Sequence, residues 1–217
     1  MKPRIHALYP LAAGLALACD PRGVSVGTEE LCVADPDLSV AQAQFAERVS
    51  TCARIGENQL LGPGFEAPVV TCENPMFCQV PAADVQVWQT TSAAQVIEVW
   101  HDGYLGVPAF EGSQFVELDA MSRDTLSQDV ALPPGQLMYW SFMHRGRNGR
   151  ESVELSIGPP EAMVSQGLFW ARPNAWYPHS GLYRVGDTET VTRFELASQT
   201  PGPEGNLIDA VVFAPVD

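Results

Sequence analysis

Four carboxylates in the middle of the chain could do acid–base chemistry on a sugar: Glu98, Glu111, Glu117 and Asp119. A glycoside hydrolase needs two carboxyl groups at a fixed separation, and a sequence alone does not give that distance. The sequence contains neither the HExxH zinc motif nor a phosphate-binding loop. We therefore predict a protein that is not an enzyme, and glycoside hydrolysis is the least favoured alternative.

Residues 161–179 are unusually rich in aromatic side chains, with basic side chains between them. Sugars present apolar C–H faces and hydroxyl rims, so their sites combine flat aromatic rings with arginine, asparagine or aspartate. The candidate ligand-binding residues in this stretch are Trp170, Arg172, Trp176 and Tyr177. An equally supported alternative is that Trp170 and Tyr177 only cover an open edge of the fold.

A second basic corner completes the candidate ligand set with Arg145 and Arg147, which lie on the same side of an extended segment. Glu111, Glu117 and Glu151 are their expected ion-pair partners. A structural ion-pair network is favoured here over a catalytic pair, and contact with a ligand is the functional alternative.

Residues 100–158 alternate between apolar and polar side chains, which predicts β-strands. We therefore expect strands to position the candidate residues. The alternation predicts a β-meander of strands 114–119, 125–132, 137–145 and 152–157, with turns at 133–135 and 147–150. Further strands are predicted at 65–70, 85–89, 96–100 and 207–213, and a hairpin joins 181–185 to 191–196. Residues 161–179 are expected to be irregular.

The charge balance excludes one class of partner. The chain has 26 acidic and 12 basic residues, for a net charge of −14. Such a surface repels phosphate backbones, so nucleic-acid binding is not expected.

The N-terminus has the pattern of an export signal. A basic start and a short apolar run occupy residues 1–18, which are too few to span a bilayer in the mature protein. The run ends in Leu15-Ala16-Leu17-Ala18-Cys19, which resembles a bacterial lipobox. Cys19 is therefore the predicted lipidation site, and an ordinary cleaved signal is the alternative. The expected location is the bacterial cell envelope, lipid-anchored and extracytoplasmic, facing the periplasm or on the cell surface.

Residues 19–58 are predicted to form a tether and a short helical extension. Four cysteines remain after Cys19, and they allow three pairings in an oxidising compartment. We favour Cys32–Cys52 and Cys72–Cys78. Zinc binding is the weaker alternative, because the spacings match no zinc pattern.

Several motifs together resemble bacterial secreted galactose-binding-like β-sandwich domains, which are related to carbohydrate-binding modules and to plant cell-wall domains of unknown function. The motifs are residues 107–118 (VPAFEGSQFVEL), 140–147 (WSFMHRGR), the opening 62–66 (GPGFE) and the closing 205–213 (GNLIDAVVF). The resemblance implies an all-β, antiparallel jelly-roll β-sandwich over residues 59–217, after the disulfide-linked extension. It covers roughly residues 60–213, and Pro63 departs from the usual opening.

The resemblance also implies a structural calcium ion held by Glu66 and Asp209, the acids of the opening and closing motifs. Ca²⁺ takes six to eight oxygen ligands, which two carboxylates and loop carbonyls could supply. The alternative is two exposed carboxylates without an ion.

The sequence is thus interpreted as a non-catalytic carbohydrate-binding or surface-interaction module of a bacterial cell-envelope lipoprotein. Its expected partner is a glycan or cell-surface polysaccharide. A protein–protein or structural envelope module, with an envelope protein as partner, is the main alternative.

Overall fold

The structure is a computed structural model that describes residues 30–31, 53–71, 77–85, 87–119, 123–200 and 205–216. The predicted signal segment 1–18, Cys19 and the pair Cys32–Cys52 lie outside the described residues. So do Cys72, the expected partner of Cys78, and the predicted helical part of the extension. Within the described ranges, no helix has the length and apolar character needed to cross a membrane.

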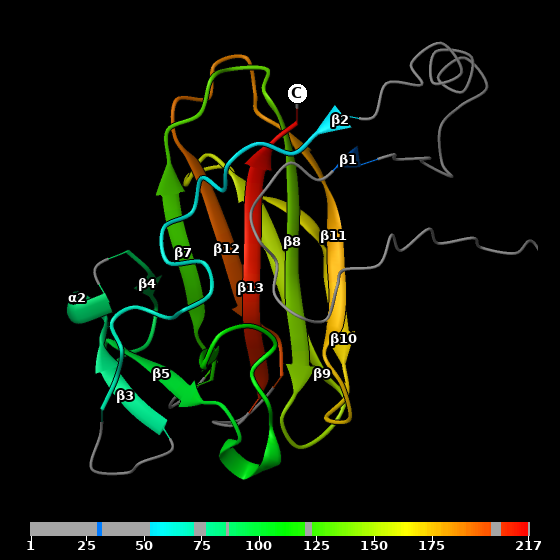
Figure 1. Cartoon of the computed structure of the whole chain (residues 1–217). Helices are drawn as coiled ribbons and strands as arrows, with labels where there is room; N and C mark the ends of the chain where they lie inside the picture. Colours follow the sequence, from blue (N-terminus) through cyan, green and yellow to red (C-terminus); the bar gives the residue numbers. More distant parts are fainter. Residues whose placement is uncertain are drawn as a thin grey trace, which may run out of the picture.

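Two antiparallel sheets make up the body of the molecule (Figure 1). The six-stranded sheet has the order β11-β8-β13-β6-β5-β3 and contains β3 (Phe77–Pro81), β5 (Val96–His101), β6 (Gln114–Glu117), β8 (Leu137–Gly146), β11 (Tyr177–Arg184) and β13 (Asn206–Pro215). The five-stranded sheet has the order β10-β9-β12-β7-β4 and contains β4 (Gln89–Thr90), β7 (Thr125–Val130), β9 (Glu151–Gly158), β10 (Val164–Ala171) and β12 (Thr192–Ser198).

Three small elements complete the described structure: the ribbon of β1 (Glu30–Leu31) with β2 (Ala53–Arg54), the helix α2 (Ala82–Val85) and the 3-10 turn η1 (Tyr104–Gly106). The described chain is therefore an all-β sandwich, as the motifs predicted.

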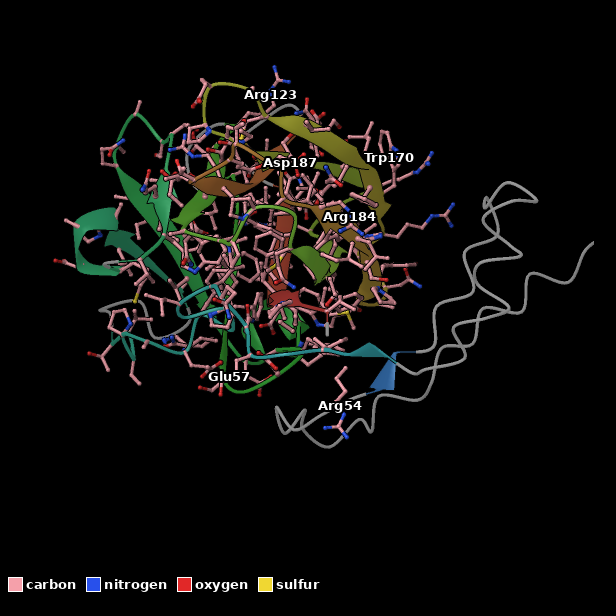
Figure 2. All side chains as sticks on the ribbon, turned by 90° about the horizontal axis from the view of Figure 1, so that it is seen from above. Arg54, Glu57, Arg123, Trp170, Arg184 and Asp187 are labelled. Carbon is pink, nitrogen blue, oxygen red and sulfur yellow. The ribbon has the colours of Figure 1, made fainter. Side chains whose placement is uncertain are left out.

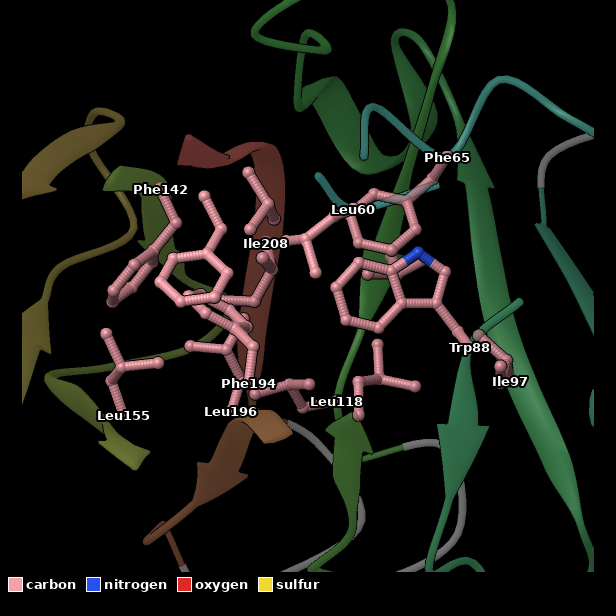
Figure 3. Close-up of a cluster of buried hydrophobic side chains, with 14 of the residues drawn as sticks. Leu60, Phe65, Trp88, Ile97, Leu118, Phe142, Leu155, Phe194, Leu196 and Ile208 are labelled. Atoms are coloured by element: carbon pink, nitrogen blue, oxygen red, sulfur yellow. The ribbon is translucent and has the colours of Figure 1, made fainter. Parts of the chain in front are cut away.

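The main core lies between the two sheets, because each strand sends every second side chain inward. In β8, Met138, Trp140 and Phe142 are buried, and in β12 Phe194 and Leu196 are fully buried. These side chains come from opposite sheets and meet in one cluster (Figure 3). Burying each such side chain contributes about 1.5–3 kcal/mol relative to leaving it exposed.

The predicted β-meander is wrong, because successive central strands do not pair with one another. The strands β6 and β8 lie in the six-stranded sheet, whereas β7 and β9 lie in the five-stranded sheet. The turns at 133–135 and 147–150 therefore connect opposite sheets instead of closing hairpins. Alternation reports which side chains are buried but not which strand is the neighbour, so it fits both arrangements.

Two of the remaining strand predictions also fail. Residues 65–70 form a loop in which Phe65 has a left-handed φ of 59° and packs its ring 5.3 Å from Trp88. Most of the predicted strand 85–89 is replaced by α2 and a short connection to β4. Apolar side chains in these segments are buried from loops, which a period-2 pattern does not distinguish from a strand.

The predicted irregular stretch 161–179 contains the regular strand β10 and the start of β11. The predicted hairpin of 181–185 with 191–196 does not form, because β11 pairs with β8 and β12 pairs with β7 and β9. The strands β10 and β11 instead occupy the same edge of the two opposite sheets.

The opening motif and the residues just before it run beside the last strand, β13. Gly56 N donates to Pro215 O at 2.8 Å, and Val211 N donates to Pro63 O at 3.1 Å. The Asn58 side chain donates to Val211 O at 2.8 Å and accepts from Phe213 N at 3.0 Å. The opening and closing motifs, about 150 residues apart in the sequence, therefore lie side by side.

One buried amide holds the loop after the opening motif against β6. The Gln114 side chain accepts from Val70 N at 2.9 Å and donates to Phe65 O at 2.7 Å and to Pro68 O at 3.1 Å. It is 1% exposed, so water does not replace these bonds.

We expect Gln114→Leu to lower the free energy of unfolding by roughly 2–4 kcal/mol, because it leaves buried backbone groups without partners. Urea denaturation measures the loss. Gln136→Leu is the control, because the Gln136 amide makes a weaker set of contacts at 3.2 and 3.5 Å. An equal effect of both substitutions would contradict this role of Gln114.

Candidate functional site

The predicted ligand-binding residues gather at one end of the sandwich. There the turn 147–150 joins β8 to β9, and the turn 172–176 joins β10 to β11. Antiparallel pairing brings the turns together, because Ala171 lies opposite Glu151 and Tyr177 lies opposite His144. We call the surface formed by Arg145, Arg147, Arg150, Arg172, Trp170, Trp176 and Tyr177 the arginine end.

Trp170 forms the side of the arginine end that belongs to the five-stranded sheet. It lies opposite Ser152 in the β9–β10 pair, and 43% of its surface is exposed. Its side chain lies at the rim of the molecule, outside the ribbon of β10 (Figure 2). The guanidinium carbon of Arg150 lies 4.4 Å from the ring centroid, so a cation–π contact fixes the ring. Arg150 was not assigned to the site from the sequence, because only the fold brings it over Trp170.

Trp176 and Arg147 form the side that belongs to the six-stranded sheet. Trp176 Nε1 donates to Pro108 O at 2.9 Å, and its ring meets Phe115 edge-on at a centroid distance of 5.5 Å. The Arg147 guanidinium lies 5.0 Å from the Trp100 ring centroid. These rings belong to a second buried cluster on the outer face of this sheet. Trp176 is therefore largely a packing residue, whereas Trp170 is exposed.

The turn 172–176 connects the two sides. Gly146 N donates to Arg172 O at 3.3 Å, and a Cβ at Gly146 would approach Ala171 O to 3.0 Å, so glycine allows this close packing. The Tyr177 hydroxyl donates to Asn174 Oδ1 at 2.9 Å. The structure thus brings all six predicted residues to one end, but it distributes them over two outer faces and a turn instead of one pocket.

The two predicted arginines of β8 and its turn differ in their pairing. Arg147 Nη1 contacts both carboxylate oxygens of Glu117 at 2.9 and 3.1 Å, which is the expected structural ion pair. Arg145 lies opposite Leu207, and its Nε is buried without a hydrogen-bond partner among the described residues. Burial lowers the pKa of Arg145.

The carboxylates considered for hydrolysis do not form a glycosidase pair. Glu98 and Glu117 lie directly opposite on β5 and β6, are 6% and 1% exposed, and hydrogen-bond to each other. Trp100 Nε1 donates to Glu98, and Gly205 N donates to Glu117, each at 2.8 Å. Retaining glycosidases hold their carboxyl groups about 5–5.5 Å apart and inverting enzymes hold them farther apart, with sugar between them. A buried pair in direct contact leaves no such space.

Asp119, another of these acids, faces the interior. Its Oδ2 accepts from Ser198 Oγ at 2.7 Å, and Asn206 links this group to His144 through a 2.7 Å contact. Burial raises the pKa of Asp119 to about 6 and lowers the pKa of His144 to about 3. His144 is therefore neutral at pH 7 and serves the interior network, not the arginine end.

The two predicted calcium ligands lie near a third carboxylate, Glu111. Asp209 Oδ2 accepts from Phe110 N and Glu111 N at 2.8 and 3.1 Å, and Glu66 Oε1 accepts from Ser113 N at 2.8 Å. Burial raises the pKa of Asp209 to about 8, with a contribution from Glu111, and the pKa of Glu111 is raised by burial and by Glu66. The mutual repulsion of neighbouring acids thus contributes to both raised pKa values.

The fit to calcium is nevertheless incomplete. The oxygens of Glu66 and Asp209 already accept backbone N–H groups, and no group of three or more His, Cys, Asp or Glu side chains among the described residues is arranged to hold a metal ion. Calcium binding stays a prediction. Glu111, which the sequence placed among the catalytic candidates, is the added member of this cluster.

Comparisons with known proteins agree with the fold. No protein-family model and no curated protein sequence matches the chain. A family 61 carbohydrate-binding module in complex with β-1,4-galactotriose is similar over 73% of this chain and 98% of its own, with 16% identity and a TM-score of 0.50. A Stig cyclase from Fischerella sp. TAU is similar over 75% and 98%, with 14% identity and a TM-score of 0.53.

A family 22 xylan-binding domain from Paenibacillus barcinonensis covers 61% of this chain and 87% of its own, with 11% identity and a TM-score of 0.44. At such identities, likeness shows the fold alone. The chain therefore has a β-sandwich of the kind found in carbohydrate-binding modules, and the same sandwich also occurs in a cyclase.

The Glu98–Glu117 contact predicts a loss of stability in alkaline solution. Burial, supported by the hydrogen bond with Glu98, raises the pKa of Glu117 to about 8 despite Arg147 and Gly205. A carboxyl group whose pKa is raised on folding contributes stability that is present below its ordinary value of 4.5 and lost as the pH rises through about 8.

Glu98→Gln supplies an amide donor to Glu117 at every pH. We expect it to reduce the loss of stability between pH 5 and pH 9 by roughly 1–3 kcal/mol, measured by urea denaturation at both pH values. Glu154→Gln, on the opposite sheet, is the control. The same pH dependence in wild type and Glu98→Gln would show that the pair does not share a proton.

Proposed function

We propose that the chain is a non-catalytic carbohydrate-binding module that contacts its glycan at the arginine end. The observation that carries this proposal is Trp170, a large aromatic side chain that is 43% exposed on a regular strand and fixed by Arg150. A ring held in this way loses little freedom on binding, which favours stacking against the C–H face of a sugar.

The other groups of the arginine end would orient the sugar through hydrogen bonds. Arg172 is exposed at the turn beside Trp170, and the Tyr177 hydroxyl and Asn174 amide form a polar rim there. Guanidinium and amide groups donate hydrogen bonds to sugar oxygens. Binding would therefore combine stacking on Trp170 with hydrogen bonds from the turn 172–176.

The cellular setting in this proposal comes from the N-terminal sequence. We infer a bacterial envelope lipoprotein, anchored through Cys19 and facing the periplasm or the cell surface. Its sandwich would meet polysaccharides outside the cytoplasm.

The second candidate is an envelope module that binds a protein partner through the same surface, which the exposed Trp170 also supports. The closed Glu98–Glu117 pair argues against the third candidate, a glycoside hydrolase.

Removal of the exposed ring tests the proposal. We expect Trp170→Ala to weaken binding to whichever polysaccharide the wild type retains by roughly tenfold, the worth of one stacking contact. Affinity electrophoresis in gels containing single polysaccharides measures the effect. Val164→Ala is the control, because Val164 is 53% exposed on the same strand but at its other end. Wild-type retention by no polysaccharide would rule out the proposal and favour a protein partner.

The proposed calcium ion has its own test. Calcium that binds only the folded state raises the melting temperature, by the equivalent of about 2.7 kcal/mol at a hundredfold excess over its dissociation constant. We expect EDTA to lower the melting temperature and Glu111→Gln to abolish the difference between calcium and EDTA. Glu111 suits this purpose because Glu66 and Asp209 have backbone hydrogen bonds to maintain. Equal melting temperatures in calcium and EDTA would exclude the ion.

A further inference from the structure

We propose that the glycan bound at the arginine end is acidic and carries carboxylate groups, as in a uronic-acid polymer. The inference rests on the proposed function and names the class of its ligand. It comes from an excess of positive charge at this end, although the chain as a whole is acidic.

Basic residues are scarce in the sequence but concentrated at this end. The chain has 12 basic residues against 26 acidic ones. Four of the basic residues, Arg145, Arg147, Arg150 and Arg172, belong to β8 and two adjoining turns. Positive charge is thus collected at one end of an otherwise acidic molecule.

Two acids near these arginines, Glu151 and Glu117, are buried and accept hydrogen bonds from groups of the protein. Glu151 is 4% exposed and accepts from Arg147 N at 2.6 Å and Asn148 N at 3.0 Å. Glu117 is 1% exposed and is engaged by Arg147 and Gly205. A ligand therefore cannot contact these two carboxylates, whereas Arg150 and Arg172 are exposed.

Three of the four arginines lack a carboxylate partner within the described structure. Only Arg147 forms an ion pair there, with Glu117. Arg145 has its Nε buried without a partner, and Arg150 instead lies over Trp170. Arg172 is exposed in the turn. A guanidinium group matches a carboxylate with two parallel hydrogen bonds, so unpaired arginines on a concentrated surface favour a ligand with carboxylates.

Farther from the turns, the outer face of the five-stranded sheet, which also carries Trp170, has the opposite character. On that part of the face Arg193 is paired with Asp129 at 2.6 Å. Glu154 and Glu195 lie on the same face, opposite Leu168 and Ser156, and add two further acids. An acidic polymer would be repelled from this part of the face and attracted to the arginine end, so charge would select its binding position as well as stabilise it.

The aromatic rings favour an acidic glycan over a simple anion. Arg150 and Trp170 present a charge and a flat apolar surface within 4.4 Å of each other. A uronate residue offers a carboxylate and a C–H face in one ring and can use both. An inorganic anion would use only the charge.

The test compares three acidic oligosaccharides, built from galacturonate, glucuronate or mannuronate, with their methyl esters, by isothermal titration at 50 and 200 mM salt. The esters keep the sugar backbone and remove the negative charge. We expect at least one acid form to bind at least tenfold more tightly than its ester. We also expect its affinity to fall as salt rises, because exposed charges are screened.

Variants locate the contact. Arg145→Gln and Arg172→Gln should each weaken binding of the acid form about three- to tenfold and leave the ester unaffected. Arg184→Gln is the matched control, because Arg184 is an exposed arginine at the other end of β11, where it donates to Gly135 O at 2.9 Å. Equal losses at Arg184 and Arg172 would show diffuse attraction and overturn the assignment.

The remaining outcomes separate this inference from the proposed function. Equal binding of acid and ester, or binding only to neutral polysaccharides with loss at Trp170→Ala, would overturn the inference and leave the carbohydrate-binding function standing. Binding to no acidic and no neutral glycan would overturn both.

Discussion

Packing of side chains between the two sheets is the constraint on which the rest of the structure depends. From β6 to β9, and again from β10 to β13, successive strands along the chain alternate between the two sheets. The sheets are therefore held together mainly by the buried residues between them, among them Trp140, Phe142, Phe194 and Phe213. Because interiors are packed as densely as organic crystals, such a core fixes the position of the sheets and of the loops at their ends.

Crossing between the sheets also creates the candidate site. The connections from β8 to β9 and from β10 to β11 run between sheets or along their shared edge, so both turns meet at one end. Arg150 then lies over Trp170, and Arg147 lies over Trp100 with Glu117 beside it. The two arginines have different roles, since Arg147 stabilises the buried Glu117 while Arg150 orients the exposed Trp170 ring.

The buried acids at this end are engaged inside the protein. Glu98 and Glu117 contact each other, and Asp119 faces the interior network of Ser198 and Asn206. Unpaired charge is costly to bury, so each of these acids has a partner or a raised pKa. Three arginines without such partners remain near the surface, which is where a ligand can reach them.

Sequence alone determined the all-β class, the strands from 114 to 157 and the last strand, because period-2 burial follows from the geometry of an extended chain. It also identified Trp170, Arg172 and Arg147 as unusual, since an aromatic-rich stretch and clustered arginines are visible in the sequence itself. It did not determine which strands pair, and the predicted meander and the 181–196 hairpin were wrong for that reason, while the strands in 161–179 were missed. Only the tertiary structure decided that Arg150 meets Trp170, that Glu98 meets Glu117 and that Trp176 is packed while Trp170 is exposed. Those contacts join residues far apart or on different strands, and alternation along one strand carries no information about its neighbour.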